Sequence, residues 1–370
     1  MTELLSNPVK HYDWGSRTAI AALTGRPTPS PEPEAEMWLG AHPSGPSLLA
    51  GRGVTLDQAI AADPEGELGG QTVARFGARL PYLLKLIAVG RVLSLQVHPS
   101  AEQAEAGHAR GAYVDAYPKP ELVCALTPFS GLAGFRAPGE AARLLQALAL
   151  PELQPVVDLL EAGEAAGALR LLLEWPDRKA LVESVVAAAG PLGHDLVLHL
   201  AEQYPDDPAV LAPLLMNRHD LKPGEALFLG AGVLHCYLSG FGVEIMGGSD
   251  NVLRAGLTPK PIDVDELLQI TDFAAQPLRV EPVDGLYTVP VPEFALGRAQ
   301  GPDDTLEGGV PRVFVCVEGE VTVDGRTLRA GESAFVPGSQ GAFEVRGPGT
   351  VFWAQPSRVA GVPAAEPECR

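Results

Sequence analysis

Two polar side chains alternate with apolar ones in residues 93–99, which read LSLQVHP. On a β-strand, residues two apart point to the same face, so we expect Gln96 and His98 to project together. Leu95 and Val97 then point the other way, into a core. Burying such a polar pair costs free energy unless a partner satisfies it, and a metal ion is one such partner. The segment therefore predicts part of a metal site.

Two further donors extend this candidate set of ligands. Glu121 offers a carboxylate, and His235 offers a second imidazole from a later predicted strand. The four side chains supply two nitrogens and two oxygens, a mixture that suits Zn²⁺ and leaves room for water or substrate. With one carboxylate the site keeps a net positive charge, so the ion can act as a Lewis acid. Each residue also has an ordinary interpretation, such as an ion pair between Glu121 and Lys119, and spacing does not show that the four meet.

The elements that must position these residues are predicted to be mostly strands. Residues 1–137 and 218–270 contain short apolar runs broken by Gly and Pro, which is typical of β-structure. Residues 138–217 are rich in Ala and Leu at helical spacing, and prolines divide them into several helices. The sequence therefore predicts a mainly β catalytic domain, with an inserted helical domain at residues 138–217.

A second β region is predicted at residues 271–360. Its segment VFVCVEGEVTVDGRTLRAGESAFVPG alternates apolar and polar positions around Asp324 and Gly325, which indicates a two-residue hairpin. Repeated strands that each end at Gly or Pro favour a small jelly-roll β-barrel. Residues 361–370 are rich in Pro and Ala, and we expect them to form a loose tail.

Composition excludes several classes of partner. The formal net charge is −19, which argues against nucleic acid because a polyanion would be repelled. No apolar run approaches the roughly 20 residues that span a bilayer, and the N-terminus does not resemble a signal peptide. The four cysteines lie far apart in the sequence, which argues against a disulfide framework and a thiolate metal site. We therefore expect a cytoplasmic protein with neither nucleic acid nor membrane as a partner.

Several blocks of the sequence resemble the type I mannose-6-phosphate isomerases, zinc enzymes of the cupin superfamily. The blocks are YDWGS, EMWLGAHPSGPS, LPYLLKLIAVGRVLSLQVHPS, YPKPELVCALTPFSGLAGFR and LSGFGVEIMGGSDNVLRAGLTPK, and they cover most of residues 10–136 and 220–265. The resemblance implies cupin-type jelly-roll β-barrels, one catalytic and one C-terminal. It also implies zinc-dependent isomerisation of D-mannose 6-phosphate and D-fructose 6-phosphate through an enediol. One zinc ion per chain is expected, with the ligands Gln96, His98, Glu121 and His235.

The same resemblance assigns chemical roles around the metal. The family's catalytic arginine falls on Arg254, which is expected to stabilise the enediolate or to bind the phosphate. Glu244 is a candidate general base, because burial raises the pKa of a carboxylate. Alternatively it orients His235 or Lys119. A lysine with a lowered pKa can also carry protons, so Lys119 is a second candidate for that role.

The remaining pocket positions are expected to bind substrate. Lys260 is the expected phosphate partner, Ser94 lies on the face that carries the metal ligands, and Asp250 either holds Arg254 or caps a turn. A local basic cluster can outweigh the acidic surface, because charges are screened within about 10 Å at 0.1 M salt. One departure from the family is Pro118, where relatives often have histidine, and it bears on the contacts with the sugar.

Two alternative functions remain open at the level of sequence. The first is another metal-dependent cupin enzyme, such as an Fe²⁺ dioxygenase, although a glutamine among the ligands argues against redox iron. The second is a sugar-binding cupin without activity, which predicts loss of a metal ligand or of Arg254, and neither residue type is missing. The expected partner is a small sugar phosphate, and we expect the chain to be a monomer.

Overall fold

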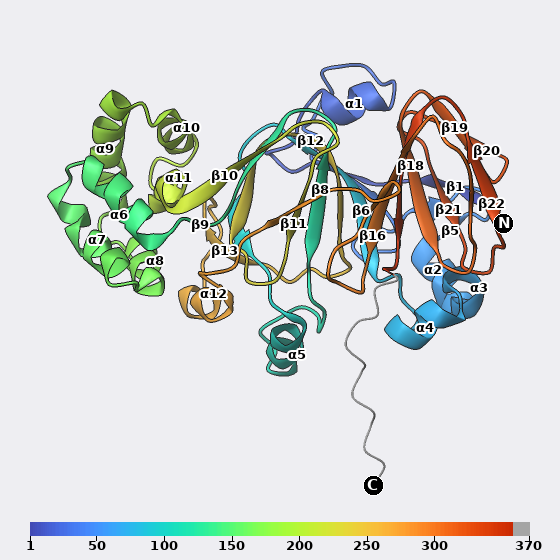
Figure 1. The fold of residues 1–370 in the computed structure, drawn as a ribbon, viewed down its shortest axis with the longest axis horizontal. Coiled ribbons are helices and arrows are strands. Elements are labelled where there is room, and N and C mark those ends of the chain that lie inside the picture. Colours follow the sequence, from blue (N-terminus) through green and yellow to red (C-terminus); the bar gives the residue numbers. More distant parts are fainter. Residues whose placement is uncertain (358–370) are drawn as a thin grey trace, which may run out of the picture.

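The computed structural model describes residues 1–357 of the chain. The molecule is elongated, with a helical block at one end, a group of strands in the middle and a second group of strands at the other end (Figure 1). The predicted tail at residues 361–370 and the last residues of the predicted C-terminal domain, 358–360, lie outside the described residues. In the described part, no helix is both long and apolar enough to cross a membrane.

The central strands form one branched sheet. Its main path runs β14-β11-β8-β12-β6-β3-β2, and β7, β9, β10 and β13 join it through β12 and through one another. The strands are β2 (Val9–Lys10), β3 (Glu36–Leu39), β6 (Tyr82–Val89), β7 (Leu95–Val97), β8 (Glu121–Ala125), β9 (Phe129–Phe135), β10 (Met216–Leu221), β11 (Ala226–Leu229), β12 (His235–Gly247), β13 (Leu253–Gly256) and β14 (Leu278–Val280).

Strand β12 connects the two halves of this sheet. Its first residues pair with β7 and β9, and its residues from Gly240 onward pair with β6 and β8. Gly240 has φ 126°, and a Cβ there would lie 2.7 Å from the Cα of Phe129, so only glycine fits at this bend. The bend places residues from both ends of β12 around one interior.

A second group of strands lies at the opposite end from the helical block. One sheet has the order β15-β16-β23-β18-β21-β1-β4-β5, and the other has the order β17-β22-β19-β20. The strands are β1 (Glu3–Ser6), β4 (Leu48–Leu49), β5 (Val54–Thr55), β15 (Leu286–Tyr287), β16 (Ala295–Gln300), β17 (Asp303–Leu306), β18 (Arg312–Glu318), β19 (Glu320–Val323), β20 (Arg326–Arg329), β21 (Ser333–Val336), β22 (Phe343–Arg346) and β23 (Thr350–Gln355).

The predicted hairpin is present in this C-terminal region. Strands β19 and β20 pair in antiparallel register, with Val323 opposite Arg326. Asp324 and Gly325 form the turn with φ values of 47° and 75°, the two positive angles that a type I′ turn requires. The prediction from the Asp-Gly pair is therefore confirmed.

The fold class is confirmed as mainly β with helices, of the cupin type, but two pairings cross the predicted domain ranges. Strand β1, at the N-terminus, pairs with β21, and β14, after residue 271, pairs with β11 of the central sheet. The division into ranges 1–137 with 218–270, 138–217 and 271–360 stays a prediction. Within the described residues, the strand pairings do not close any of the sheets into a complete barrel.

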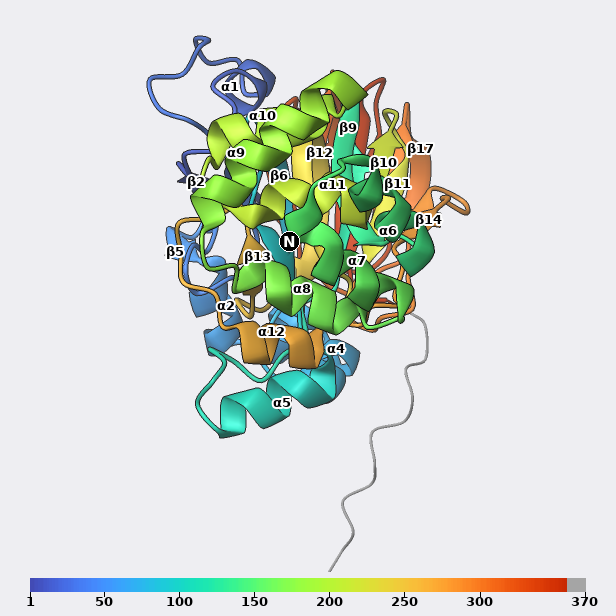
Figure 2. The ribbon, with the colours of Figure 1, turned by 90° about the vertical axis from the view of Figure 1, so that its left-hand side faces the viewer.

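The helical block lies between β9 and β10 in the sequence. It consists of α6 (Pro138–Ala147), η1 (Pro151–Leu153), α7 (Gln154–Glu161), α8 (Ala165–Leu173), α9 (Arg178–Ala189), η2 (Gly190–Leu192), α10 (Asp195–Gln203), η3 (Pro208–Leu211) and α11 (Ala212–Leu215). Figure 2 shows these helices stacked in front of the central strands. Pro151, Pro191 and Pro208 each stand in the first turn of a 3₁₀ segment, where the missing N–H costs nothing.

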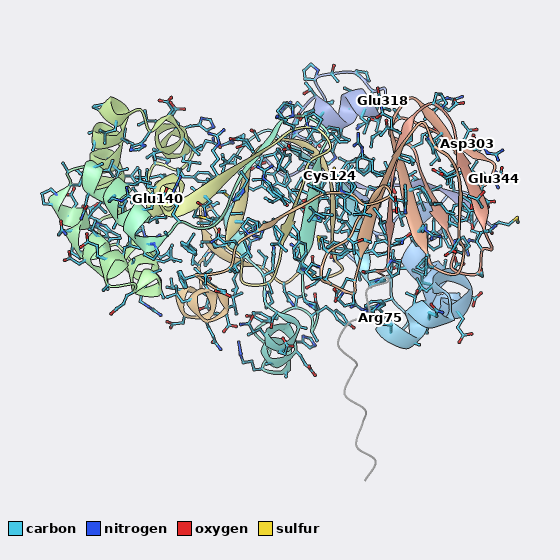
Figure 3. All side chains as sticks on the ribbon, in the orientation of Figure 1. Arg75, Cys124, Glu140, Asp303, Glu318 and Glu344 are labelled. Carbon is cyan, nitrogen blue, oxygen red and sulfur yellow. The ribbon has the colours of Figure 1, made fainter. Side chains whose placement is uncertain are left out.

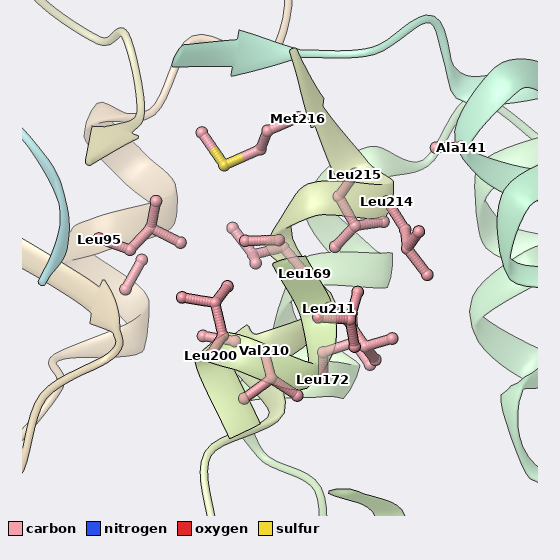
Figure 4. Close-up of a cluster of buried hydrophobic side chains, with 14 of the residues drawn as sticks. Leu95, Ala141, Leu169, Leu172, Leu200, Val210, Leu211, Leu214, Leu215 and Met216 are labelled. Carbon is pink, nitrogen blue, oxygen red and sulfur yellow. The ribbon is translucent and has the colours of Figure 1, made fainter. Parts of the chain in front are cut away.

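Apolar side chains join the helical block to the outer face of the central sheet. Leu95 of β7 and Met216 of β10 lie in one buried cluster with Leu169, Leu200 and Leu211 of the helices (Figure 4). Because Leu95 points into this cluster, Gln96 points to the other side of its strand. The helical block therefore fixes which face of β7 the polar side chains occupy.

Shorter helices complete the chain. They are α1 (Ala19–Leu23), α2 (Leu56–Ala62), α3 (Pro64–Leu68), α4 (Gly70–Phe76), α5 (Ala101–Ala109) and α12 (Val264–Ile270). Figure 3 places Cys124 among the central strands, with Glu140 in the helical block and Glu344 in the C-terminal strands. The three cysteines in the described residues, Cys124, Cys236 and Cys316, are buried and free.

Candidate metal centre and active site

Three buried side chains from different elements converge inside the central sheet. His98 follows β7, Glu121 begins β8 and His235 begins β12, and their ligand atoms lie within 4.8 Å of one another. Glu121 Oε1 is 3.2 Å from His98 Nε2, and Glu121 Oε2 is 3.2 Å from His235 Nε2. Residues far apart in the sequence thus form one compact cluster of nitrogen and oxygen donors.

Hydrogen bonds from the other ring nitrogens fix the tautomers of both histidines. His98 Nδ1 is 2.8 Å from the carbonyl oxygen of Asn251, and His235 Nδ1 is 2.9 Å from that of Val233. A carbonyl oxygen only accepts, so each Nδ1 carries the proton and donates it, and in a neutral ring Nε2 is left as a bare lone pair. Burial lowers the pKa of His98 to about 4, which keeps that ring neutral near pH 7.

The bare nitrogens face carboxylate oxygens, which cannot donate a proton to them. His98 Nε2 and Glu121 Oε2 are buried without a hydrogen-bond partner. Acceptor atoms that face one another in a buried space repel unless a cation lies between them. The donor set fits a divalent metal ion, and two imidazoles with one carboxylate is a set that zinc accepts. The carbonyl groups that orient the rings supply the usual support for such ligands.

Gln96 and Lys119 border this cluster. The amide nitrogen of Gln96 is 3.5 Å from His235 Nε2, and a half-turn of the carboxamide exchanges its nitrogen with its oxygen. Lys119 Nζ is 3.2 Å from Glu121 Oε1. Although burial raises the pKa of Glu121, the nearby Lys119 and His98 hold it well below its usual value. The carboxylate is therefore ionised and available to a metal.

A second buried polar cluster lies beside the first, and the sequence interpretation did not find it. Lys85 of β6 is 3.3 Å from both Glu36 Oε1 of β3 and Glu244 Oε2 of β12. Tyr237 donates its hydroxyl to Glu244 Oε1 at 2.9 Å. A lysine in the middle of the apolar run LLKLIAV is the signal that could have revealed it, since an unpaired buried lysine is very costly.

Glu244 makes contacts different from those expected of an orienting residue. Its carboxylate contacts Lys85 and Tyr237 rather than His235 or Lys119. Burial raises the pKa of Glu244, and Glu121 and Glu36 add to that effect, while Lys85 opposes it. The side chain lines the same cavity as the metal cluster, where a carboxylate with a raised pKa can accept and return a proton.

Both polar clusters open into one cavity of about 670 Å³. The other predicted site residues also line it: Ser94, Lys119, Asp250, Arg254 and Lys260. Arg254 lies on β13 opposite Gln96, and burial lowers its pKa. Within the described residues, neither Arg254 nor Lys260 has an ion-pair partner, so both positive charges are available to an anion in the cavity.

Asp250 is held by residues other than Arg254. One carboxylate oxygen of Asp250 is 3.5 Å from His42 Nε2, and Ser44 donates its hydroxyl to the other at 3.3 Å. The sequence interpretation gave His42 no functional role, yet this ring is buried against Trp38 and directs its nitrogen at a cavity residue. The expectation that Asp250 holds Arg254 finds no contact to support it.

Asn251 is the other residue that the site depends on and that sequence reasoning missed. Its carbonyl oxygen accepts from His98, and its amide nitrogen donates to the carbonyl oxygens of Asp115 and Tyr117 at 2.8 and 3.0 Å. Ser249 donates to Asp115 as well. The loop at residues 249–251 is thereby fixed to residues 115–117, which lead into Lys119 and Glu121.

Together the mainly β cupin fold, the buried histidine–carboxylate cluster and the cation-lined cavity define a metal-binding protein for an anionic ligand. Residues 3–138 match the family described as phosphomannose isomerase type I, catalytic domain. The mannose-6-phosphate isomerase of Escherichia coli K12 is 36% identical over 93% of this chain and 97% of the relative. That of Rattus norvegicus is 32% identical over 94% and 92%. The chain therefore belongs to the type I phosphomannose isomerases.

A solved structure supports this family assignment over the whole fold. Mannose-6-phosphate isomerase from Salmonella typhimurium, bound to fructose 6-phosphate and zinc, matches with a TM-score of 0.86 and 32% sequence identity. The match covers 96% of this chain and 99% of that structure. The likeness includes the helical block and the C-terminal strands as well as the region that matches the family.

Proposed function

We propose that this chain interconverts D-mannose 6-phosphate and D-fructose 6-phosphate and binds one zinc ion through Gln96, His98, Glu121 and His235. The observation that carries the proposal is the pair of buried, unpartnered acceptors, His98 Nε2 and Glu121 Oε2, where Glu121 also lines a cavity that contains Lys119, Arg254 and Lys260. The membership in the family and the relative bound to fructose 6-phosphate and zinc support the same reaction.

The reaction moves a proton between C2 and C1 of the open-chain sugar through an enediol. Zinc, when bound, polarises the sugar oxygens and stabilises negative charge that develops on them. Glu244 takes and returns the proton, since its pKa is raised and its contacts with Lys85 and Tyr237 hold it in the cavity wall. Lys119 is the competing candidate for the proton carrier, because it also lines the cavity beside Glu121.

The cavity cations hold the substrate's negative charges. Arg254, on the strand beside Gln96, stabilises the enediolate, and Lys260 binds the phosphate at the cavity rim. Ser94 and Asp250 complete the proposed substrate contacts as hydrogen-bonding groups of the wall. Because the two cations make no ion pair within the described residues, no internal contact must break when the sugar phosphate enters.

We place the chain in the cytoplasm, where a reducing environment suits its free, buried cysteines. We expect it to act as a monomer, as the sequence analysis predicted.

A coupled assay tests the function directly. Purified protein should convert mannose 6-phosphate to fructose 6-phosphate, lose the activity with a chelator and regain it with Zn²⁺. Full activity after all metal has been removed would refute the role of zinc. Arg254→Ala should lower turnover greatly while zinc content stays at one per chain, and Arg329→Ala, an exposed residue of β20, serves as the matched control.

A further inference from the structure

We propose that Asp207, in the helical block, is a positioning residue for the phosphate of the substrate. Its carboxylate holds the cavity-wall segment at residues 254–260, which carries Arg254, Thr258 and Lys260. The inference rests on the proposed function, because it relies on the assignment of Lys260 to the phosphate of a sugar phosphate. It gives the helical block a role in substrate binding, although the block contributes none of the proposed metal ligands.

The two oxygens of Asp207 bind two different parts of the molecule. Oδ1 accepts from the backbone nitrogen of Ala209 at 2.9 Å, at the beginning of η3. Oδ2 accepts from the backbone nitrogen of Leu257 at 2.6 Å. Leu257 lines the cavity three residues after Arg254 and three before Lys260. A single carboxylate therefore joins the helical block to the centre of the cation-bearing segment.

The backbone at this contact is in a conformation that needs support. Leu257 has φ 51°, in the left-handed region that residues with a side chain disfavour. The preceding Gly256 has φ 130°, and a Cβ there would lie 2.2 Å from the Cβ of Ala209. The segment thus packs directly against η3, and a charge-assisted hydrogen bond from Leu257 to Asp207 stabilises the unfavourable turn.

A neighbouring contact fixes the same part of the helical block to the loop before β7. Tyr204, the residue after α10, donates its hydroxyl to the carbonyl oxygen of Val92 at 3.0 Å, and both residues line the cavity. Residues 204–207 therefore connect the loop before β7 with the segment after β13. This arrangement makes Asp207 a fixed anchor rather than part of a mobile surface loop.

The competing explanation is that Asp207 only caps η3. Asp177 provides a matched control, because its side chain accepts from Ala180 at 3.1 Å at the beginning of α9. It lies in the same block, but within the described residues its side chain makes no hydrogen bond to a residue of the cavity wall. Replacement of either aspartate by alanine removes a cap from a helical segment. Only Asp207→Ala also releases the cavity-wall segment at residues 254–260.

The experiment uses zinc-loaded protein and two measurements. Calorimetric titration with inorganic phosphate reports the anion site, and steady-state assays with mannose 6-phosphate give KM and kcat. We expect Asp207→Ala to weaken phosphate binding and raise KM by the same factor, about tenfold, since a charge-assisted hydrogen bond is lost. The change in kcat should be smaller, because Arg254 of β13 is still held opposite Gln96 of β7 by the strand pairing. Asp177→Ala should change none of these values, while both variants lower Tm.

Two outcomes would overturn the proposal. The first is unchanged phosphate affinity in Asp207→Ala with a loss of Tm like that of Asp177→Ala, because a cap alone explains it. The second is a fall in kcat with KM and phosphate affinity unchanged. If the alanine variant does not fold, Asp207→Asn, which keeps one acceptor oxygen, should show a smaller loss of phosphate affinity. The phosphate titration tests the role of Asp207 even if the wild-type protein lacks isomerase activity. A wild-type protein that binds no phosphate would also overturn the proposal.

Discussion

The central strands and the C-terminal strands enclose interiors of opposite character. Around β12, inward positions carry charged or polar groups, including His98, Glu121, Lys85 and Glu244, and they surround a cavity. Between the C-terminal sheets, aromatic and aliphatic side chains such as Phe314 fill the interior. The same kind of β-structure therefore encloses a polar cavity in the central strands and a packed apolar core in the C-terminal strands.

The difference shows which buried polar groups indicate a ligand. Lys85, Glu36, Glu244 and Tyr237 are buried, but they satisfy one another. His98 Nε2 and Glu121 Oε2, a short distance away, have no hydrogen-bond partner. A satisfied cluster stabilises and positions its members, whereas unsatisfied acceptors that face each other require a cation. The comparison thus indicates a site for a cation between these atoms without reference to any relative.

The largest expected effect comes from the unsatisfied cluster. Glu121→Gln keeps the shape of the side chain but removes the charge that balances the metal, so zinc should be lost. Turnover should fall by about 10³ or more, because the stabilisation of developing negative charge disappears with the ion. Metal analysis and the coupled assay measure both effects. A variant that retains one zinc per chain and wild-type turnover would show that Glu121 is not a ligand.

The packed interior should behave in the opposite way. Phe314→Ala leaves a void in the C-terminal core and should lower the free energy of unfolding by about 3–5 kcal/mol. Denaturant titration measures that loss, and the control is zinc content and kcat per folded molecule, which should not change. A variant with normal stability and reduced kcat would contradict the division of roles between the two interiors.

The stability of the metal-free protein should depend on pH because of the buried His98. The folded-state pKa of His98 is lowered to about 4, whereas an exposed histidine has a pKa near 6.5. Between these values the unfolded chain binds a proton that the folded chain does not, so stability should fall as pH drops from about 6.5 to 4. The lowered pKa of Glu121 acts in the same direction at the acid end.

Thermal unfolding of chelator-treated protein across this pH range tests the linkage. His98→Asn should flatten the dependence, because the titrating ring is gone. Equal slopes for the variant and the wild type would mean that the ring at position 98 does not cause the dependence.

The smallest effect is expected in the satisfied cluster. Tyr237→Phe removes one donor from Glu244 and should lower the free energy of unfolding by about 1 kcal/mol. Because a hydrogen bond to a carboxylate favours its ionised form, the pKa of Glu244 should rise further. If Glu244 carries the proton, the acidic limb of the pH–rate profile shifts to higher pH. An unshifted limb with normal zinc content would favour Lys119 as the proton carrier.

Local patterns were enough to predict much of the fold. The Asp324-Gly325 pair predicted its hairpin, because both turn angles are set by those two residues. The alternation in LSLQVHP predicted which side chains share a face of β7, because the strand period is fixed by the backbone. The resemblance to a family then indicated which distant residues share a site. Most of them line one cavity, and His98 and His235 lie beside the lining residue Glu121.

Pairings between distant segments could not be read from the sequence. Nothing in the sequence of β1 indicates that it pairs with β21, more than 300 residues later. Asp207 likewise has the sequence signature of an ordinary helix cap, and its bond to Leu257 depends on how the helical block docks. Lys85 escaped notice because its partners come from two other strands. Such contacts depend on tertiary packing, which no local pattern records.

Anomalous diffraction at the zinc edge tests the central claim most directly. Crystals of active protein should show one peak per chain, within bonding distance of Nε2 of His98 and His235 and of the Glu121 carboxylate. A peak elsewhere, or none in protein that still converts mannose 6-phosphate, would contradict the account.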